Sequence, residues 1–272
     1  MRNGSQSMYR TDLDRLITRI MSQPLWHETD SRGNKVLNTT PIVFTSPKPP
    51  FSLFRRISHK IAQSELHWML TGSGCGDTRE AQVTEEVADI WSPWAGDMGP
   101  MYGVQWRKWL GQKGLIDQVK EVKDLLINDP RTRRAVISNW AVHEVRDMKL
   151  PPCPMTYTFN TYGGLLNLSV SARSTDIICG LPYDLLHGYM FMTLMANSVG
   201  YTPGILSFFS ASPHIYEEHR DLFTRWARFH PLVWSVEPTL NLKSGTTIEN
   251  FTGKEFTAYY NTAPVRHAQV VV

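Results

Sequence analysis

One stretch, residues 155–199, constrains the fold of this 272-residue chain more than any other. Residues 155–173 (MTYTFNTYGGLLNLSVSAR) are rich in β-branched and aromatic side chains on both sides of Tyr162-Gly163-Gly164, a pattern typical of two strands joined by a hairpin turn. Residues 184–199 follow as one long apolar segment of helical length, which we expect to lie in the core. Strands combined with a buried helix favour an α/β domain.

The remaining elements are predicted from local pattern. Apolar residues at helical spacing indicate helices, β-branched runs indicate strands, and segments rich in Gly or Pro mark their ends. Pro41 interrupts one predicted strand, which indicates an edge strand or a break. The predicted helices cover residues 8–23, 57–71, 104–127 and 213–229, and the predicted strands cover residues 36–46, 135–138 and 204–212 and short segments near the C-terminus.

Composition and charge indicate a single folded domain over residues 1–272. The hydrophobic content is 42% and the charged content is 19%, and no repeat or shift in composition divides the chain. The net charge of +3 comes from mixed acidic and basic residues, so a nucleic-acid polymer is a poor candidate partner. Three scattered cysteines indicate neither a disulfide framework nor a zinc site. With no apolar leader and no membrane-spanning run, we expect a reduced, cytoplasmic protein that needs no metal.

Cys153 is the candidate nucleophile. A lone cysteine is more often a small buried hydrophobic residue, and its neighbour Pro154 cannot act as a base. A catalytic thiolate here would need a positive charge nearby, and Arg173 is a candidate.

Charged residues elsewhere suggest an anion site and a proton carrier. The run Asp129-Pro130-Arg131-Thr132-Arg133-Arg134 is either a solvated loop or a phosphate site, because guanidinium groups match phosphate oxygens bidentately. Glu65 lies on a predicted helix among apolar neighbours. It is either exposed or paired, or it faces a pocket and moves protons.

Three further polar residues have both a structural and a functional interpretation. His214 and Tyr216 lie on one face if their segment is extended, and either could simply satisfy a hydrogen bond in the core. Asp184 precedes the apolar segment and would by default be the N-cap of a helix.

The order of these residues along the chain resembles the thymidylate synthase superfamily. The similarity runs from about Arg32 to Tyr216 and returns weakly at residues 263–265. It implies a mixed β-sheet packed with helices, in which one face of the sheet forms a homodimer interface. The stretches that carry the similarity are Ile90-Trp91, GPMYGVQWR at 99–107, DPRTRR at 129–134, Pro152-Cys153, RSTD at 173–176, GLP at 180–182 and His214-Ile215-Tyr216.

The resemblance also implies a folate-dependent reaction on a pyrimidine nucleoside monophosphate. The thiolate of Cys153 would add to C6 of the base, which makes C5 nucleophilic toward the methylene carbon of 5,10-methylenetetrahydrofolate. Glu65 would relay protons, and Tyr102 would help to remove the proton from C5. The binding residues it implies are Arg32, Arg173 and Ser174 at the 5′-phosphate, Arg133 and Arg134 donated to that phosphate across the homodimer interface, His214 and Tyr216 at the 3′-hydroxyl, and Trp91, Asp176, Gly180 and Tyr183 on the folate side.

Asp184 departs from the family pattern. Members that act on dUMP have Asn at this position, and its amide donates to O4 of uracil. An ionised carboxylate only accepts hydrogen bonds, so it repels O4 but accepts from the N4 amino group of cytosine. One misplaced buried polar contact costs about 1–3 kcal/mol, roughly tenfold to a hundredfold or more in affinity. Asp184 therefore favours dCMP as the substrate.

Other departures indicate a specialised member. Pro154 replaces the usual His after the nucleophile, Ala172 replaces a Gln, the phosphate loop is reduced to Arg32-Gly33-Asn34, and His187 replaces a small residue. Cytosine-directed relatives are mostly hydroxymethylases of bacteriophages that modify their DNA, which favours dCMP 5-hydroxymethylation and, for a phage-encoded chain, the host cytoplasm. The alternatives are dCMP methylation by hydride transfer, hydroxymethylation of CMP or dUMP, thymidylate synthesis, and an inactive relative that binds nucleotide or RNA.

Overall fold

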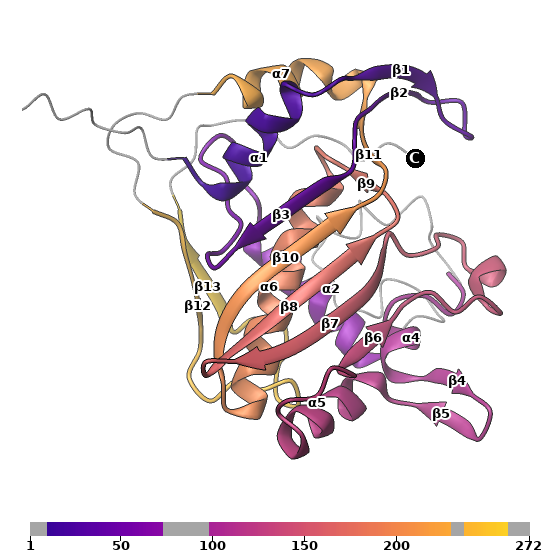
Figure 1. Cartoon of the computed structure of the whole chain (residues 1–272), viewed down its shortest axis with the longest axis vertical. Coiled ribbons are helices and arrows are strands. Elements are labelled where there is room, and N and C mark those ends of the chain that lie inside the picture. The colour runs from indigo at the N-terminus through magenta and orange to yellow at the C-terminus, as the bar shows by residue number, and fades with distance from the viewer. Residues whose placement is uncertain (1–9, 73–97, 230–236, 261–272) are drawn as a thin grey trace, which may run out of the picture.

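The computed structural model describes residues 10–72, 98–229 and 237–260, and its centre is a five-stranded mixed sheet (Figure 1). Neighbouring strands are antiparallel except β8 and β10, which run parallel and are connected through a long helix, α6 (Gly180–Val199). The order across this sheet is β3 (Ile42–Ser46), β10 (Thr202–Ser210), β8 (Leu165–Ala172), β7 (Pro154–Tyr162) and β6 (Val136–Ser138).

One face of the main sheet is covered by α6, and α2 (His59–Thr71) packs against α6 (Figure 1). Gly188 allows α6 to lie close to the sheet, because a Cβ at this position would already be 3.1 Å from Cδ1 of Leu206. Most of α6 is buried, as its apolar sequence predicts. Ser58 caps the start of α2, and Gly72 ends it in the left-handed conformation with φ 71°.

A smaller sheet extends from the edge of the core. Its order is β1 (Trp26–Thr29), β2 (Lys35–Asn38), β11 (Pro213–Tyr216) and β9 (Thr175–Asp176). β9 follows β8 directly and β11 follows β10, so the functional motifs in both segments leave the main sheet at the same end. The remaining described elements are α1 (Asp12–Met21), α4 (Gly103–Arg107), α5 (Gln118–Asn128), α7 (Arg220–Ala227), the hairpins β4 (Trp109–Gly111) with β5 (Gly114–Ile116) and β12 (Thr239–Leu242) with β13 (Phe256–Tyr259), and 3-10 turns at Val145–Asp147 and Glu217–His219.

Several predictions of elements are confirmed. The hairpin over residues 155–173 forms, with Gly163 and Gly164 at positive φ in its turn. The predicted break at Pro41 separates β2 from β3, which belong to different sheets. Helix α1 buries the apolar positions that predicted it, and Thr11 caps its start.

Three predictions are wrong. A helix over residues 104–127 does not form, because Gly111 and Gly114 close a two-residue hairpin loop between α4 and α5. Residues 213–229 begin with β11, which pairs with β2 and β9, so the helix starts only at Arg220. Asp184 is not an N-cap, because α6 starts four residues earlier with Cys179 as its cap and Pro182 in its first turn.

None of the helices in the described part of the chain combines the length and the apolar character required to cross a bilayer.

Candidate active site

Cys153 lies immediately before β7, at the end of the main sheet where β8 turns into β9. Its carbonyl oxygen accepts a hydrogen bond from the backbone N–H of Arg173 at 2.9 Å, and Pro152 and Pro154 restrict the backbone on either side. The side chain is half-buried. The position next to a strand end therefore holds the thiol in a defined place.

Burial raises the pKa of the Cys153 thiol to about 11, although the positive charge of Arg173 and, more weakly, that of Arg32 act in the opposite direction. The carboxylate of Asp184 adds to the increase. A thiol in this environment is protonated at neutral pH, so it becomes a nucleophile only when a further charge or a base favours the thiolate.

Arg173 also positions the loop that carries the thiol. Its Nε donates to the carbonyl oxygen of Pro152 at 3.0 Å, and its Nη2 donates to that of Pro151 at 2.6 Å. The guanidinium carbon lies 5.8 Å from the centre of the Trp140 ring. Sequence reasoning assigned Arg173 to a phosphate, and the structure adds these backbone contacts.

Glu65 and His187 form a buried pair across two helices. Oε2 of Glu65, on α2, lies 3.0 Å from Nε2 of His187, on α6, and their side chains are only 12% and 8% exposed. Burial opposes a charge on His187, but the carboxylates of Glu65 and Asp184 outweigh it and raise the pKa of the imidazole. A carboxylate facing an imidazolium is the arrangement that this environment favours.

Asp184 lies near the start of α6, one helical turn before His187. Its Oδ2 accepts from the hydroxyl of Thr175 at 3.4 Å. Burial raises the pKa of Asp184 to about 7, against the influence of His187 and with that of Glu65. Its carboxyl group is thus about half ionised near pH 7. Its charge also acts on Cys153, Tyr102 and Tyr157.

Tyr102 is buried and stands at φ 35°, the one described residue other than glycine with a positive φ. Such a conformation is costly and persists where the surroundings enforce it, often at functional sites. Burial raises the pKa of Tyr102 well above its ordinary range, and Cys153 and Asp184 contribute. Tyr157 on β7 lies in the same environment, and burial and Asp184 raise its pKa too. Sequence reasoning did not identify Tyr157, although it stands four residues after the nucleophile.

His214 and Tyr216 lie on the same face of β11, as expected for an extended segment, with their ring centres 5.1 Å apart. Nδ1 of His214 is 3.4 Å from Oγ of Ser174, which donates to the carbonyl oxygen of Ser212. Arg32 reaches the hydroxyl of Tyr216 and pairs with Asp30 at 3.5 Å. Four predicted substrate residues from three segments, Arg32, Ser174, His214 and Tyr216, therefore lie close together.

Asp176, Gly180 and Tyr183 lie beside Asp184 at the start of α6. A Cβ on Gly180 would be 3.8 Å from Cβ of Asp176 and 3.9 Å from Oδ2 of Asp184. The hydroxyl of Tyr183 accepts from the backbone N–H of Ser58, the N-cap of α2, at 3.4 Å. Trp91, the fourth residue predicted for this side, lies outside the described residues.

Sequence reasoning missed Arg55, which lies on the same side of the site. It is only 2% exposed, its Nη1 donates to the carbonyl oxygen of Ile178 at 2.5 Å, and its Nε is buried without a hydrogen-bond partner. In the sequence, nothing except the adjacent Arg56 marks Arg55 as a candidate site residue.

Arg133 and Arg134 are exposed in the loop before β6. β6 is an edge strand of the main sheet and is separated from β8 by β7. The structure of one chain therefore does not bring these two arginines together with the residues around Cys153.

Comparisons with known proteins show the family of this chain. The family model described as thymidylate synthase matches residues 13–272. A thymidylate synthase of Zymomonas mobilis is 31% identical over 205 residues, which cover 63% of this chain and 68% of that protein. The chain belongs to the thymidylate synthase family, whose members transfer one carbon from methylenetetrahydrofolate to a pyrimidine nucleotide without a metal.

Proposed function

We propose that this protein is a deoxycytidylate 5-hydroxymethylase: it converts dCMP, methylenetetrahydrofolate and water to 5-hydroxymethyl-dCMP and tetrahydrofolate. The observation that supports the proposal is the position of Asp184 near the start of α6, where its carboxyl group acts electrostatically on Cys153, Tyr102 and Tyr157. We infer that it faces the polar edge of a base bonded to Cys153.

The chemistry of Asp184 favours cytosine. An ionised carboxylate accepts from the N4 amino group of cytosine but repels O4 of uracil. The pKa of about 7 places this ionisation within the physiological range. Thr175 donates to Oδ2 and supports the ionised form. One correctly paired buried contact accounts for about tenfold to a hundredfold in substrate preference.

The residues of the chain divide the reaction between them. Cys153 adds to C6 of the base, and the electron pair displaced from the C5–C6 bond makes C5 a nucleophile. Bound folate supplies the methylene carbon that C5 attacks. Tyr102 helps to remove the proton from C5, and Glu65 moves protons around the base. Loss of the C5 proton goes with cleavage of the bond between the methylene carbon and the folate nitrogen, which releases tetrahydrofolate and leaves an exocyclic methylene group on C5. Addition of water to this group and release of the thiolate from C6 then complete the hydroxymethyl product.

The Glu65–His187 pair supports water over hydride as the final nucleophile. The carboxylate and the imidazole lie 3.0 Å apart and are nearly buried, and we infer that this polar pair binds an ordered water beside the base. Glu65 can take a proton from such a water, and His187 holds the carboxylate in place. A methyltransferase would instead benefit from an apolar surrounding that excludes water.

The folate side would be formed by Asp176, Gly180, Tyr183 and Arg55. The buried Nε–H of Arg55 is a hydrogen-bond donor without an acceptor among the described residues. Folate carries several carbonyl and carboxylate oxygens that can accept this hydrogen bond. The residues present therefore fit such a co-substrate.

We propose that the active form is a homodimer in which Arg133 and Arg134 reach the phosphate in the opposite site. The main-sheet face turned away from α6 has no described helix over it (Figure 1). Large apolar side chains from β3, β10 and β6 are exposed there, Val43 at 55%, Phe209 at 40% and Val136 at 40%. A second copy would bury them and bring the two arginines toward another active site.

The proposal is tested by incubating the protein with methylenetetrahydrofolate and dCMP, dUMP or CMP and identifying each product by mass. We expect 5-hydroxymethyl-dCMP and tetrahydrofolate from dCMP, and little product from dUMP. The Asp184→Asn variant should shift the preference toward dUMP by at least about tenfold.

Three results would overturn parts of the proposal. Faster turnover of dUMP than of dCMP by the unmodified protein would contradict the role of Asp184. Formation of dihydrofolate with a methylated product would establish the second candidate, dCMP methylation by hydride transfer. A Cys153→Ser variant with full activity would exclude the covalent mechanism.

A further inference from the structure

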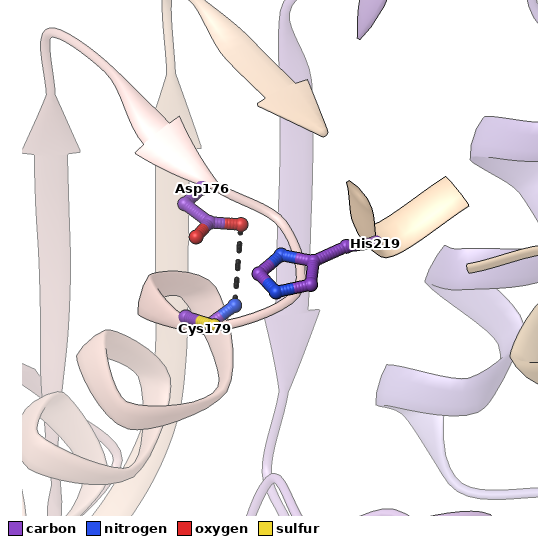
Figure 2. Close-up of side chains that lie close together, drawn as sticks. All are labelled: Asp176, Cys179 and His219. Carbon is purple, nitrogen blue, oxygen red and sulfur yellow. Dashed lines mark hydrogen bonds between the residues drawn. The ribbon is translucent and has the colours of Figure 1, made fainter. Parts of the chain in front are cut away.

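Asp176, Cys179 and His219 bring three different metal-binding groups together beside the active site (Figure 2). Asp176 ends β9, Cys179 is the N-cap of α6, and His219 ends the 3-10 turn that follows β11. A carboxylate oxygen, the thiol sulfur and an imidazole nitrogen all lie within 4.8 Å of one another. Asp176 and Cys179 are three positions apart in the sequence, but His219 is 40 positions after Cys179. The pairing of β9 with β11 brings His219 close to the other two residues.

The backbone orients Asp176 toward this cluster. Its Oδ1 accepts from the backbone N–H groups of Ile178 and Cys179 at 2.8 Å and 3.2 Å. These two bonds fix the carboxylate over the turn that leads into α6 and leave Oδ2 as a second potential ligand atom. The carboxylate and the sulfur are therefore held on the same side of the turn.

His219 provides an independent observation that points to a ligand. The residue is only 6% exposed, and its Nδ1 is buried without a hydrogen-bond partner. Its ring points toward Asp176 and Cys179 (Figure 2). Its Nε2 lies 3.5 Å from Oε1 of Glu218. A proton on Nε2, facing this carboxylate, leaves the lone pair on Nδ1, which is the form that binds metals.

The type of ligand identifies the class of ion. Sulfur and imidazole nitrogen favour zinc and similar transition metals over magnesium and calcium, which prefer oxygen. Around a tetrahedral zinc ion with bonds of about 2.0–2.3 Å, ligand atoms lie about 3.3–3.8 Å apart. The three ligand atoms lie within 4.8 Å of one another, so they would have to approach by at most about 1 Å to 1.5 Å to reach that geometry. The two negative charges of a thiolate and a carboxylate balance the charge of a divalent ion. The guanidinium of Arg55, which donates to the carbonyl oxygen of Ile178, is the nearby positive charge.

We propose that Asp176, Cys179 and His219 form a binding site for a zinc-like divalent transition-metal ion. The reaction of the family needs no such ion, so binding has a different consequence. Because Asp176 belongs to the folate side of the proposed active site, an ion on its carboxylate competes with the co-substrate and inhibits turnover. This second part rests on the proposed function, whereas metal binding itself does not.

Metal binding is tested with Co²⁺ on the full chain in which Cys75 and Cys153 are replaced by Ser, so that Cys179 is the sole thiol among the three cysteines. We expect one Co²⁺ per chain, with a near-ultraviolet thiolate-to-metal absorption band and visible bands of a tetrahedral ion. Zn²⁺ should abolish these bands by displacement. Further replacement of Cys179 by Ser should remove the thiolate band, and His219→Gln should weaken binding at least about tenfold.

The matched control is His214→Gln, which changes a histidine in β11, the strand that leads into the turn of His219, and should leave the bands intact. Absence of the thiolate band in the parent, or its persistence after Cys179→Ser, would overturn the site. Circular dichroism of each variant shows whether it is folded. If Cys179→Ser unfolds, the outcome is still decided by the number of Co²⁺ ions bound per parent chain and by the loss of Co²⁺ affinity in His219→Gln.

Inhibition is measured separately. In the unmodified protein, which keeps Cys153, Zn²⁺ should inhibit turnover, and this inhibition should be competitive with folate. The inhibition constant of Zn²⁺ should be at least about tenfold weaker for the single variant Cys179→Ser. Failure of dCMP hydroxymethylation would leave the metal titration unaffected, because that titration contains neither nucleotide nor folate. The two proposals can therefore fail independently.

Discussion

Single residues in this site owe their chemistry to burial and to one or two charged neighbours. Asp184 and Glu65 are both carboxylates, yet only Glu65 has a histidine within 3.0 Å. Burial raises the pKa of Asp184 to about 7, while the same surroundings favour the charged form of His187. We propose that these two carboxyl groups, in different environments, take different roles, Asp184 in base recognition and Glu65 in proton transfer.

Substrate preference should depend on pH through Asp184. Below about pH 7 its protonated carboxyl can donate to O4 of uracil, whereas above that pH the ionised group only accepts and matches N4 of cytosine. In the Cys153→Ser variant, which binds without reacting, we expect the ratio of the dUMP to the dCMP dissociation constant to rise by about tenfold between about pH 6 and pH 8.5. Phosphate ionisation cancels in this ratio, which titration calorimetry measures. Adding Asp184→Asn should make the ratio independent of pH, and a flat ratio without that change would contradict the assignment.

His187 should act by positioning Glu65. Replacing His187 by Ser removes the partner of a buried carboxylate, so we expect kcat to fall by about tenfold to a hundredfold with a smaller effect on KM, and the pH profile of kcat to shift. His187→Gln keeps a hydrogen-bond donor and should recover part of the rate. Tyr189→Phe, on the same helix, is the control and should be nearly neutral. Equal losses in kcat and stability, with no shift of the pH profile, would indicate a merely structural role.

At the scale of the secondary-structure elements, the turn before α4 positions one of the proposed catalytic side chains. Tyr102 enters the site from the turn before α4, at a positive φ. Gly99 begins this turn with φ +75°, and a Cβ on it would lie 2.1 Å from the carbonyl oxygen of Asp147. The turn is therefore locked against the segment at Val145–Asp147, and this contact sets the place of Tyr102.

The variant Gly99→Ala should be strongly destabilised. It combines backbone strain with a clash against a carbonyl oxygen, so the free energy of unfolding should fall by more than about 2 kcal/mol. Gly163→Ala is the matched control, since Gly163 has φ +62° with no other atom within 4 Å of an added Cβ, and strain alone costs about 1–2 kcal/mol. Urea denaturation of the two variants measures the difference. Equal costs would show that the contact with Asp147 is unimportant.

At the scale of the whole molecule, the main sheet has two unlike faces. One face carries α6 and the active-site residues near its start, and the opposite face exposes Val43 and Phe209. Arg133 and Arg134 lie at the β6 edge, on another part of the surface from Cys153. These positions make biological sense if two copies associate through the exposed face.

Mixing two inactive variants should restore activity. A chain with Cys153→Ser keeps its arginines, and a chain with Arg133→Glu and Arg134→Glu keeps its thiol, so a mixed dimer contains one complete site. Random exchange in an equal mixture makes about half of the dimers mixed, which gives about a quarter of the normal activity. Each variant alone is the control. A mixture that stays inactive although mass spectrometry detects mixed dimers would exclude arginine donation.

The sequence by itself determined the family, because the order of its motifs around Cys153 is specific. It also determined the elements whose pattern is local: the hairpin at residues 155–173 and the break at Pro41 follow from turn residues and side-chain alternation. Local pattern failed at residues 104–127, where a two-residue turn outweighed helical spacing. It failed again at residues 213–216, where pairing with β2 and β9 imposed an extended backbone.

Only the tertiary structure decided which side chains meet. Glu65 and His187 are joined by the packing of α2 on α6, and Asp176, Cys179 and His219 by the pairing of β9 with β11. The raised pKa of Asp184 has the same origin, since burial and neighbouring charges are properties of the packed core. Periodicity and turn chemistry act within a few residues, whereas these contacts depend on how distant elements pack. For that reason the residue types could be predicted from the sequence, but their partners, charges and spacing could not.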